Sequence, residues 1–128
     1  MLLPGHRLPF SIDDLYSGLA RVNGLLSLEK DEVVMEFQTQ DNIVGVLKGR
    51  TGTARIPVRE LYEVEVKTSW LSRFLIIRPS SLTWLERIPG ADESQLKLKF
   101  KKRDLQSAKE IASYLNLRIS EIRLEEME

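Results

Sequence analysis

Basic side chains form the two groupings with the most evident chemical use in this 128-residue chain. Lys97, Lys99 and Lys101 alternate with apolar residues and are followed by Lys102 and Arg103, with no acid among them. On a strand, alternate residues project to the same face, so these lysines would form one positive row. We interpret the row either as an ordinary solvated face or edge-strand guard, or as a weak, salt-sensitive contact for an anionic membrane.

A second basic group surrounds a glycine-rich loop and consists of Lys48, Arg50, Arg55 and Arg59. Backbone amides in such a loop can hold a phosphate, although the spacing of Gly49-Arg50-Thr51-Gly52 is neither a P-loop nor a dinucleotide-binding fingerprint. The two groups together provide the candidate residues for an anionic lipid or a phosphate-bearing ligand, which are Lys48, Arg50, Arg55, Lys97, Lys99 and Lys101.

Apolar side chains beside the second group indicate a different kind of partner. The run from Ile43 to Leu47 cannot all face a core, so it would present an apolar patch suited to a partner subunit. Trp70 falls where two predicted strands reverse, and there a large aromatic either caps the core or anchors an interface. The candidate residues for protein contacts are Ile43, Val44, Val46, Leu47 and Trp70.

Residues suited to catalysis or metal binding are scarce. The chain has no cysteine, and its single histidine, His6, sits in a Pro/Gly-flanked N-terminal segment, away from any Ser or Thr in a recognisable nucleophile pattern. Carboxylate pairs such as Glu63 and Glu65 are common on solvated faces. No His, Cys or carboxylate cluster has metal-ligand spacing. The sequence therefore predicts a non-catalytic protein without a cofactor or a metal.

Overall composition limits the partners and the location. Nineteen Lys and Arg balance nineteen Asp and Glu, so no global field attracts the chain to nucleic acid, and membrane attraction would have to be local. A chain of this length fits one domain with a genuine core. No apolar run is long enough to span a membrane, and the first ten residues lack the pattern of a signal peptide, so we predict a cytoplasmic protein.

Short alternating segments dominate the middle of the chain. Val33 to Thr39 alternates after a Lys30-Asp31 turn, and Tyr62 to Trp70 is the clearest half-buried strand. We predict seven short strands, starting at Gly24, Val33, Ala54, Tyr62, Phe74, Leu82 and Gln95. The run from 41 to 50 is treated as an insertion whose period fits either one helical turn or a buried strand.

Two helices are predicted to flank these strands. Phe10-Ser11-Ile12-Asp13-Asp14-Leu15 has a capping serine, an acid three positions on and a staple pair, which predicts a short N-terminal helix. After Arg103-Asp104, the apolar stripe of Leu105, Ala108, Ile111, Ala112 and Leu115 predicts an amphipathic closing helix. The predicted organisation is a tail with a short helix (1–23), a β domain closed by a helix (24–117), and a helical extension or frayed tail (118–128).

Two passages support a family resemblance. They are Ile56-Pro57-Val58-Arg59-Glu60-Leu61-Tyr62-Glu63-Val64, and the closing pattern of Leu96, Leu98, Phe100, Arg103-Asp104, Ala108, Ile111 and Leu115. Over residues 24–117 the chain resembles the pleckstrin-homology-like superfold, in its bacterial and GRAM-type branches. The resemblance implies a mainly β fold, a seven-stranded partly open barrel or sandwich capped by one C-terminal α-helix.

The same resemblance implies a binding module, since such domains bind lipid head groups, peptides or other proteins, and the bacterial ones resemble self-assembling modules. Where they bind phosphoinositide, the first hairpin loop is basic, whereas Glu29-Lys30-Asp31-Glu32 has three acids and one base and would repel a polyphosphate. Our first hypothesis is a non-catalytic module acting through protein contacts, including contacts between its own copies. The alternative is a peripheral binder of anionic lipid or a phosphate-bearing ligand.

Overall fold

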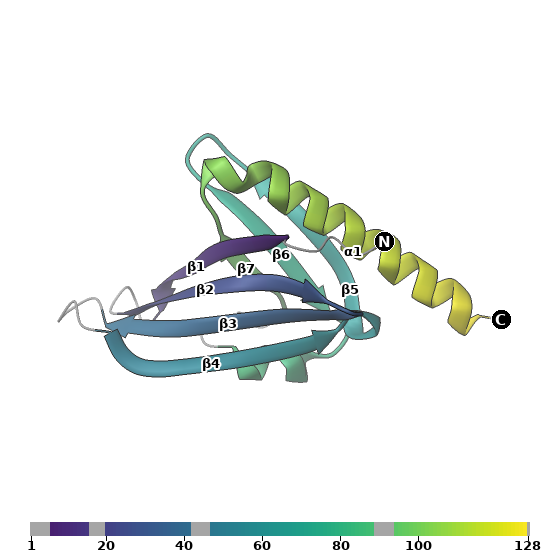
Figure 1. Ribbon diagram of the computed structural model, residues 1–128, viewed down its shortest axis with the longest axis horizontal. Coiled ribbons are helices and arrows are strands. Elements are labelled where there is room, and N and C mark those ends of the chain that lie inside the picture. The colour runs from purple at the N-terminus through teal and green to yellow at the C-terminus, as the bar shows by residue number, and fades with distance from the viewer. Residues whose placement is uncertain (1–5, 16–19, 42–46, 89–93, 128) are drawn as a thin grey trace.

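A computed structural model describes residues 6–15, 20–41, 47–88 and 94–127, with the side chains of 14, 15, 20, 40, 41, 47–50 and 87 outside the description. Seven strands form one antiparallel sheet in the order β4-β3-β2-β1-β7-β6-β5. The strands are β1 (Arg7–Leu15), β2 (Ala20–Glu29), β3 (Glu32–Asp41), β4 (Leu47–Pro57), β5 (Leu61–Thr68), β6 (Arg73–Pro79) and β7 (Leu96–Lys99). One long helix, α1 (Leu105–Glu126), follows the last strand (Figure 1).

The predicted fold class is confirmed, since the protein is mainly β with a C-terminal helix on a partly open sheet. The strands β4 and β5 are the two edges of the sheet, which therefore does not close into a full barrel. In Figure 1, β1 to β4 form one layer and β5 to β7 run at an angle to it. The two layers join through one paired position, Ser11 of β1 opposite Lys99 of β7.

Apolar side chains from both layers and from α1 fill the space between them. Leu26, Met35, Leu75 and Leu98 are fully buried there. The apolar stripe predicted for the closing helix is confirmed, because α1 buries Ala108, Ile111, Ala112 and Leu115, with Ile119 added one turn later. Leu105 packs partly against this core. The helix continues past residue 117 without a break as far as Glu126.

The predicted N-terminal helix is wrong, because Arg7–Leu15 is the strand β1. β1 pairs along its length with β2 and buries Leu8, Phe10 and Ile12 on one face. This spacing of two outweighs the capping signal at Ser11, since burying three apolar side chains contributes far more than one cap bond. Residues 16–19, the rest of the expected helix, lie outside the described residues.

The strand predicted at Leu82 is also wrong. Leu82–Arg87 is a 3-10 helix, started by Ser81, whose side chain accepts a hydrogen bond from the Thr83 amide at 3.4 Å. Trp84 in this segment packs partly against the core. Seven strands were expected and seven are found, but β1 takes the place of the segment at 82. In the predicted insertion, Leu47 onward belongs to β4, and residues 42–46 lie outside the description.

Aromatic rings cover two glycines on the core face of the first layer. Phe10 lies opposite Gly24, and Phe37 lies opposite both Gly24 and Gly52 in the strand register. A Cβ atom added to Gly24 would sit 2.3 Å from the Phe10 ring and 2.6 Å from the carbonyl oxygen of Glu36. One added to Gly52 would meet the Phe37 ring at 2.6 Å. The glycines leave the room that the rings occupy.

The helix α1 also covers one edge of the sheet. The Asn116 side chain donates to the Val64 carbonyl at 2.7 Å and accepts from the Val64 amide at 3.0 Å, as a neighbouring strand would. Arg123 donates to the Tyr62 carbonyl at 3.1 Å, and its guanidinium lies 5.1 Å from the Tyr62 ring centre. These contacts satisfy β5 backbone groups that no strand pairs, which protects this edge from pairing with another chain.

A bidentate ion pair connects α1 to the turn between β2 and β3. Arg118 donates to the two carboxylate oxygens of Asp31 at 2.7 and 2.9 Å. Asp31 has a φ of 52°, in the left-handed region, and its carbonyl accepts from the Val58 amide at 2.9 Å. The hydrogen bonds from Arg118 hold the pKa of Asp31 below its usual value, and desolvation opposes them only in part.

We expect Asp31→Asn to lower the urea midpoint at neutral pH, because asparagine tolerates the left-handed backbone but carries no charge for Arg118. Since the folded pKa of Asp31 is depressed, its stabilisation is complete above the unfolded value of about 4 and is lost as pH falls through the lower folded value. Urea titrations should therefore show the stability difference between the two proteins shrinking as the pH falls below the unfolded pKa and vanishing below the depressed folded pKa of Asp31. If the stability difference between the wild type and Asp31→Asn stayed the same in acid, its cause would be the left-handed backbone at residue 31 and not the ion pair with Arg118.

Candidate functional site

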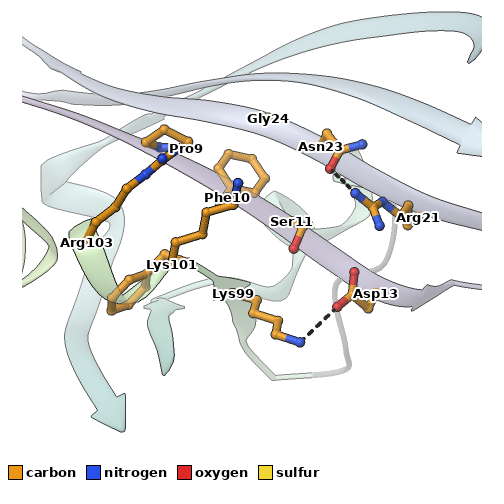
Figure 2. Close-up of a pocket in the computed structure, with 11 residues that line it drawn as sticks. Pro9, Phe10, Ser11, Asp13, Arg21, Asn23, Gly24, Lys99, Lys101 and Arg103 are labelled. Atoms are coloured by element: carbon orange, nitrogen blue, oxygen red, sulfur yellow. Dashed lines mark hydrogen bonds and ion pairs between the residues drawn. The ribbon is translucent and has the colours of Figure 1, made fainter. Parts of the chain in front are cut away.

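A cleft with several basic side chains opens where the two layers of the sheet join. It has a volume of about 400 Å³ and lies on the solvent side of β1, β2 and β7. Figure 2 shows Arg103 and Lys101 toward one end and Arg21 and Asp13 toward the other. The remaining lining residues are Pro9, Phe10, Ser11, Asn23, Gly24, Lys99 and Phe100. We call this the cationic cleft.

The cleft contains four cations and one carboxylate. Lys99 lies 3.3 Å from Asp13, and Arg21 donates to the Asn23 side-chain oxygen at 3.4 Å (Figure 2). Lys101 and Arg103 are exposed, and neither side chain forms a hydrogen bond or an ion pair within the described parts of the chain. The cleft therefore has an excess of positive charge, which suits an anionic group.

The divergence of two strands creates this cleft. β1 and β7 are paired only at Ser11 and Lys99, and beyond that point the chain of β7 turns toward α1. Phe100 donates its amide to the carbonyl of Arg73 in β6 at 3.1 Å, rather than to β1. Lys101 and Arg103 therefore stand apart from β1 and leave an opening between the layers.

A hydrogen-bonded turn displays two apolar side chains between β5 and β6. Trp70 is 88% exposed and Leu71 is 71% exposed, in the connection between β5 and β6. Ser69 and Ser72 brace the turn, since the Ser69 amide donates to the Ser72 carbonyl at 2.8 Å and the Ser72 amide donates to the Ser69 hydroxyl at 3.2 Å. Of the two alternatives for Trp70, the structure therefore excludes capping of the core.

The predicted anion-binding residues are only partly brought together. Lys99 and Lys101 line the cationic cleft, and Lys97 on the same strand lies over the Phe74 ring, 4.6 Å from its centre. Arg55 lies elsewhere and bonds to Glu29 and, at 3.4 Å, to Glu32, whose carboxylates raise the pKa of Arg55. The side chains of Lys48 and Arg50 are outside the description, although their backbone belongs to β4.

Most of the predicted protein-contact residues cannot be placed. Ile43, Val44 and Val46 lie outside the described residues, and only the backbone of Leu47 is described, paired with Gln40. Trp70 is the one member of that set whose side chain is seen, and it is far more exposed than a core residue. Self-association through this surface stays a prediction.

Sequence reasoning missed Arg21, Ser11 and Asn23 as site residues. Arg21 falls within the segment 1–23 that was predicted to be a tail with a short helix, whereas it lies on β2 with its side chain at the cleft. The available signal was the alternation of Leu8, Phe10 and Ile12, which marks β1 as a strand and places Ser11 on its solvent face.

Metal and membrane-span criteria give negative results in the part of the chain that the structure describes. No group of three or more His, Cys, Asp or Glu residues there could hold a metal ion. No helix among those residues is long and apolar enough to cross a membrane. The absence of catalysis remains a prediction from the sequence.

Comparison of the chain with known proteins identified no similar protein. No protein-family model, no curated protein and no solved structure matches this chain. The pleckstrin-homology-like family membership therefore stays an expectation from the sequence, and the functional argument depends on the site itself.

Proposed function

We propose that this protein is a non-catalytic module that binds peripherally to an anionic membrane surface. Two features support this proposal: the exposed apolar pair of Trp70 and Leu71, and three exposed cations, Lys101, Lys102 and Arg103, that have no acidic partner among the described residues. Aromatic and aliphatic side chains favour the interfacial layer of a bilayer, and basic side chains favour the phosphate groups above it.

Covalent and hydrogen-bonded connections place the two features at one end of the molecule. Arg73 follows the apolar turn by two residues, and its carbonyl accepts the amide of Phe100, the residue before Lys101. In Figure 1 the connection between β5 and β6 reaches the same corner as the beginning of α1. The apolar turn and the cations therefore extend from neighbouring backbone segments.

Neither feature is sufficient alone. Three basic residues near an anionic surface contribute roughly 3 kcal/mol, at about 1 kcal/mol each. Burying a leucine-sized side chain contributes about 1.5 to 3 kcal/mol, and orientational costs reduce the total. Weak, reversible and salt-sensitive binding is the expected outcome, as for other anchors that need two signals.

Vesicle sedimentation tests the proposal. The protein should sediment with phosphatidylcholine vesicles that contain phosphatidylserine, and should stay in solution with phosphatidylcholine alone. Raising the salt from 0.1 M to 1 M shortens the screening length from about 10 to about 3 Å and should release it. Trp70→Ser with Leu71→Ser, and separately Lys101→Gln with Arg103→Gln, should each weaken the vesicle-binding constant by roughly tenfold, or about 1.4 kcal/mol.

A matched control uses another exposed apolar residue. Leu82 is 59% exposed but follows the far end of β6, so Leu82→Ser should leave sedimentation unchanged. Binding that survives loss of the apolar turn and the cations would overturn the proposal. The proposal would also be overturned if the protein did not sediment with anionic vesicles and had a dimeric mass by light scattering. That result would favour the self-association hypothesis.

A further inference from the structure

We infer that the solvent face of the first layer carries a second binding site, a polar furrow that takes a short oligosaccharide with one acidic group at its end. This site goes beyond the proposed membrane contact and needs no bilayer. It combines the cationic cleft with a neighbouring depression of about 530 Å³ across β2, β3 and β4. Asn23 and Gly24 line both, so the two depressions adjoin one another.

The strand register explains why polar side chains follow this path. Ser11 is opposite Asn23, Asn23 is opposite Gln38, and Gln38 is opposite Thr51. Residues directly opposite one another share a face, so these four form one row across β1 to β4. On the other side Ser11 is opposite Lys99, which continues the row into the cationic cleft.

A second row runs parallel to the first and forms the other wall. It consists of Pro9, Leu25, Glu36 and Thr53, which are opposite one another in the same register. Between the two rows lie Phe10, Gly24, Phe37 and Gly52, whose places in the alternation put their side chains on the core face. The floor of the furrow is therefore mainly backbone. Four strand spacings of about 4.8 Å separate Lys99 from Thr51, which is longer than a single sugar ring needs.

The chemistry changes along the furrow. The end formed by Lys99, Lys101 and Arg103 is positive, whereas the stretch past Asn23 contains amide and hydroxyl groups, which exchange hydrogen bonds with sugar hydroxyls. Glu36 accepts hydrogen bonds there but repels negative charge. A chain with an acid on every unit, such as a nucleic acid or a heparin fragment, would place charge against Glu36. An oligosaccharide with one terminal acid would place that acid at the positive end of the furrow and its neutral sugars along the polar stretch beside Glu36.

Sialyllactose is a suitable probe because it joins one carboxylated sugar to a neutral disaccharide. In amide NMR titrations of the whole chain we expect shifts at Ser11, Gln38 and Thr51, and affinity roughly tenfold greater than for free sialic acid or for lactose. Gln38→Ala should reduce the affinity for sialyllactose several-fold and leave that for sialic acid unchanged. Arg21→Gln should weaken both. Gln106→Ala, which removes a glutamine from the surface of α1, is the matched control.

Three results would overturn the inference. One is sialyllactose binding no tighter than sialic acid, which would leave a simple anion cleft. Another is an absence of shifts at Gln38 and Thr51. The third is tighter binding of a heparin fragment, which would show that Glu36 does not select against repeated charge. Gln38→Ala should sediment with anionic vesicles like the wild type, so failure here and failure of the membrane proposal are distinguishable.

Discussion

Ile111→Asp is expected to abolish cooperative folding. Ile111 is fully buried on the face of α1 that packs against the sheet. The change removes an apolar side chain and places a carboxylate in a core where none of the described buried residues is charged. The cost is about 5 kcal/mol or more, comparable with the stability of a typical domain. Circular dichroism should show no cooperative thermal transition, and the amide NMR spectrum should lose its chemical-shift dispersion.

The control for this change lies on the opposite side of the same helix. Leu117 is 61% exposed, so Leu117→Asp introduces the same carboxylate without entering the core. It should unfold within a few degrees of the wild type. A stable, well-dispersed Ile111→Asp protein would mean that the seam between helix and sheet is not the centre of the core.

Gly24→Ala is expected to destabilise the protein by about 3 kcal/mol, more than a methyl group usually costs. The added carbon would press against the Glu36 carbonyl at 2.6 Å, and that backbone is held by pairing with β2 and β4. It would also displace the Phe10 ring, which is nearly fully buried. Urea unfolding followed by tryptophan fluorescence measures the loss.

Gly52→Ala makes the matched comparison. The three atoms nearest to its added carbon all belong to the Phe37 ring, a half-buried side chain rather than backbone. We expect a loss of about 1 kcal/mol or less, partly offset by the smaller chain entropy of alanine in the unfolded state. Equal losses at the two glycines would contradict the role assigned to the Glu36 carbonyl.

The two binding proposals use neighbouring surfaces but different chemistry. Membrane contact depends on Trp70, Leu71 and the cations that follow β7, whereas the furrow depends on the register of β1 to β4. Lys101 and Arg103 belong to both. Vesicle and sugar experiments on the same variants separate these contributions.

The elements predicted correctly from the sequence are those with strong local signals. The turn at Lys30-Asp31 joins two alternating runs and appears as the hairpin of β2 and β3. The closing helix has an apolar stripe at i, i+3 and i+4 spacing, and Ala108, Ile111 and Leu115 are buried as expected. Hydrophobic periodicity is a property of each segment alone, so it can be read without knowing which other segments pack against it.

The wrong assignments have contrary local signals. Ser11 and Asp14 have the spacing of a capping box, yet Phe10 and Ile12 belong to a strand, because pairing on both sides with β2 and β7 buries them. At Leu82 the apolar residues resembled a short strand, but Ser81 caps a 3-10 turn there. Tertiary burial decided the first and local side-chain hydrogen bonding decided the second.

The amino-acid sequence by itself determined the mainly β architecture and the closing helix. It also predicted one positive row of Lys97, Lys99 and Lys101, of which Lys101 lies beyond the end of β7. Only the tertiary structure decided that Arg21 lies at one cleft with Lys99 and Lys101. It also decided that Arg55 forms an ion pair with Glu29 and that Trp70 faces solvent. The reason is physical. Alternation follows from the geometry of one strand, whereas a cleft depends on which strands become neighbours and in what register, and that is settled by long-range packing of the core.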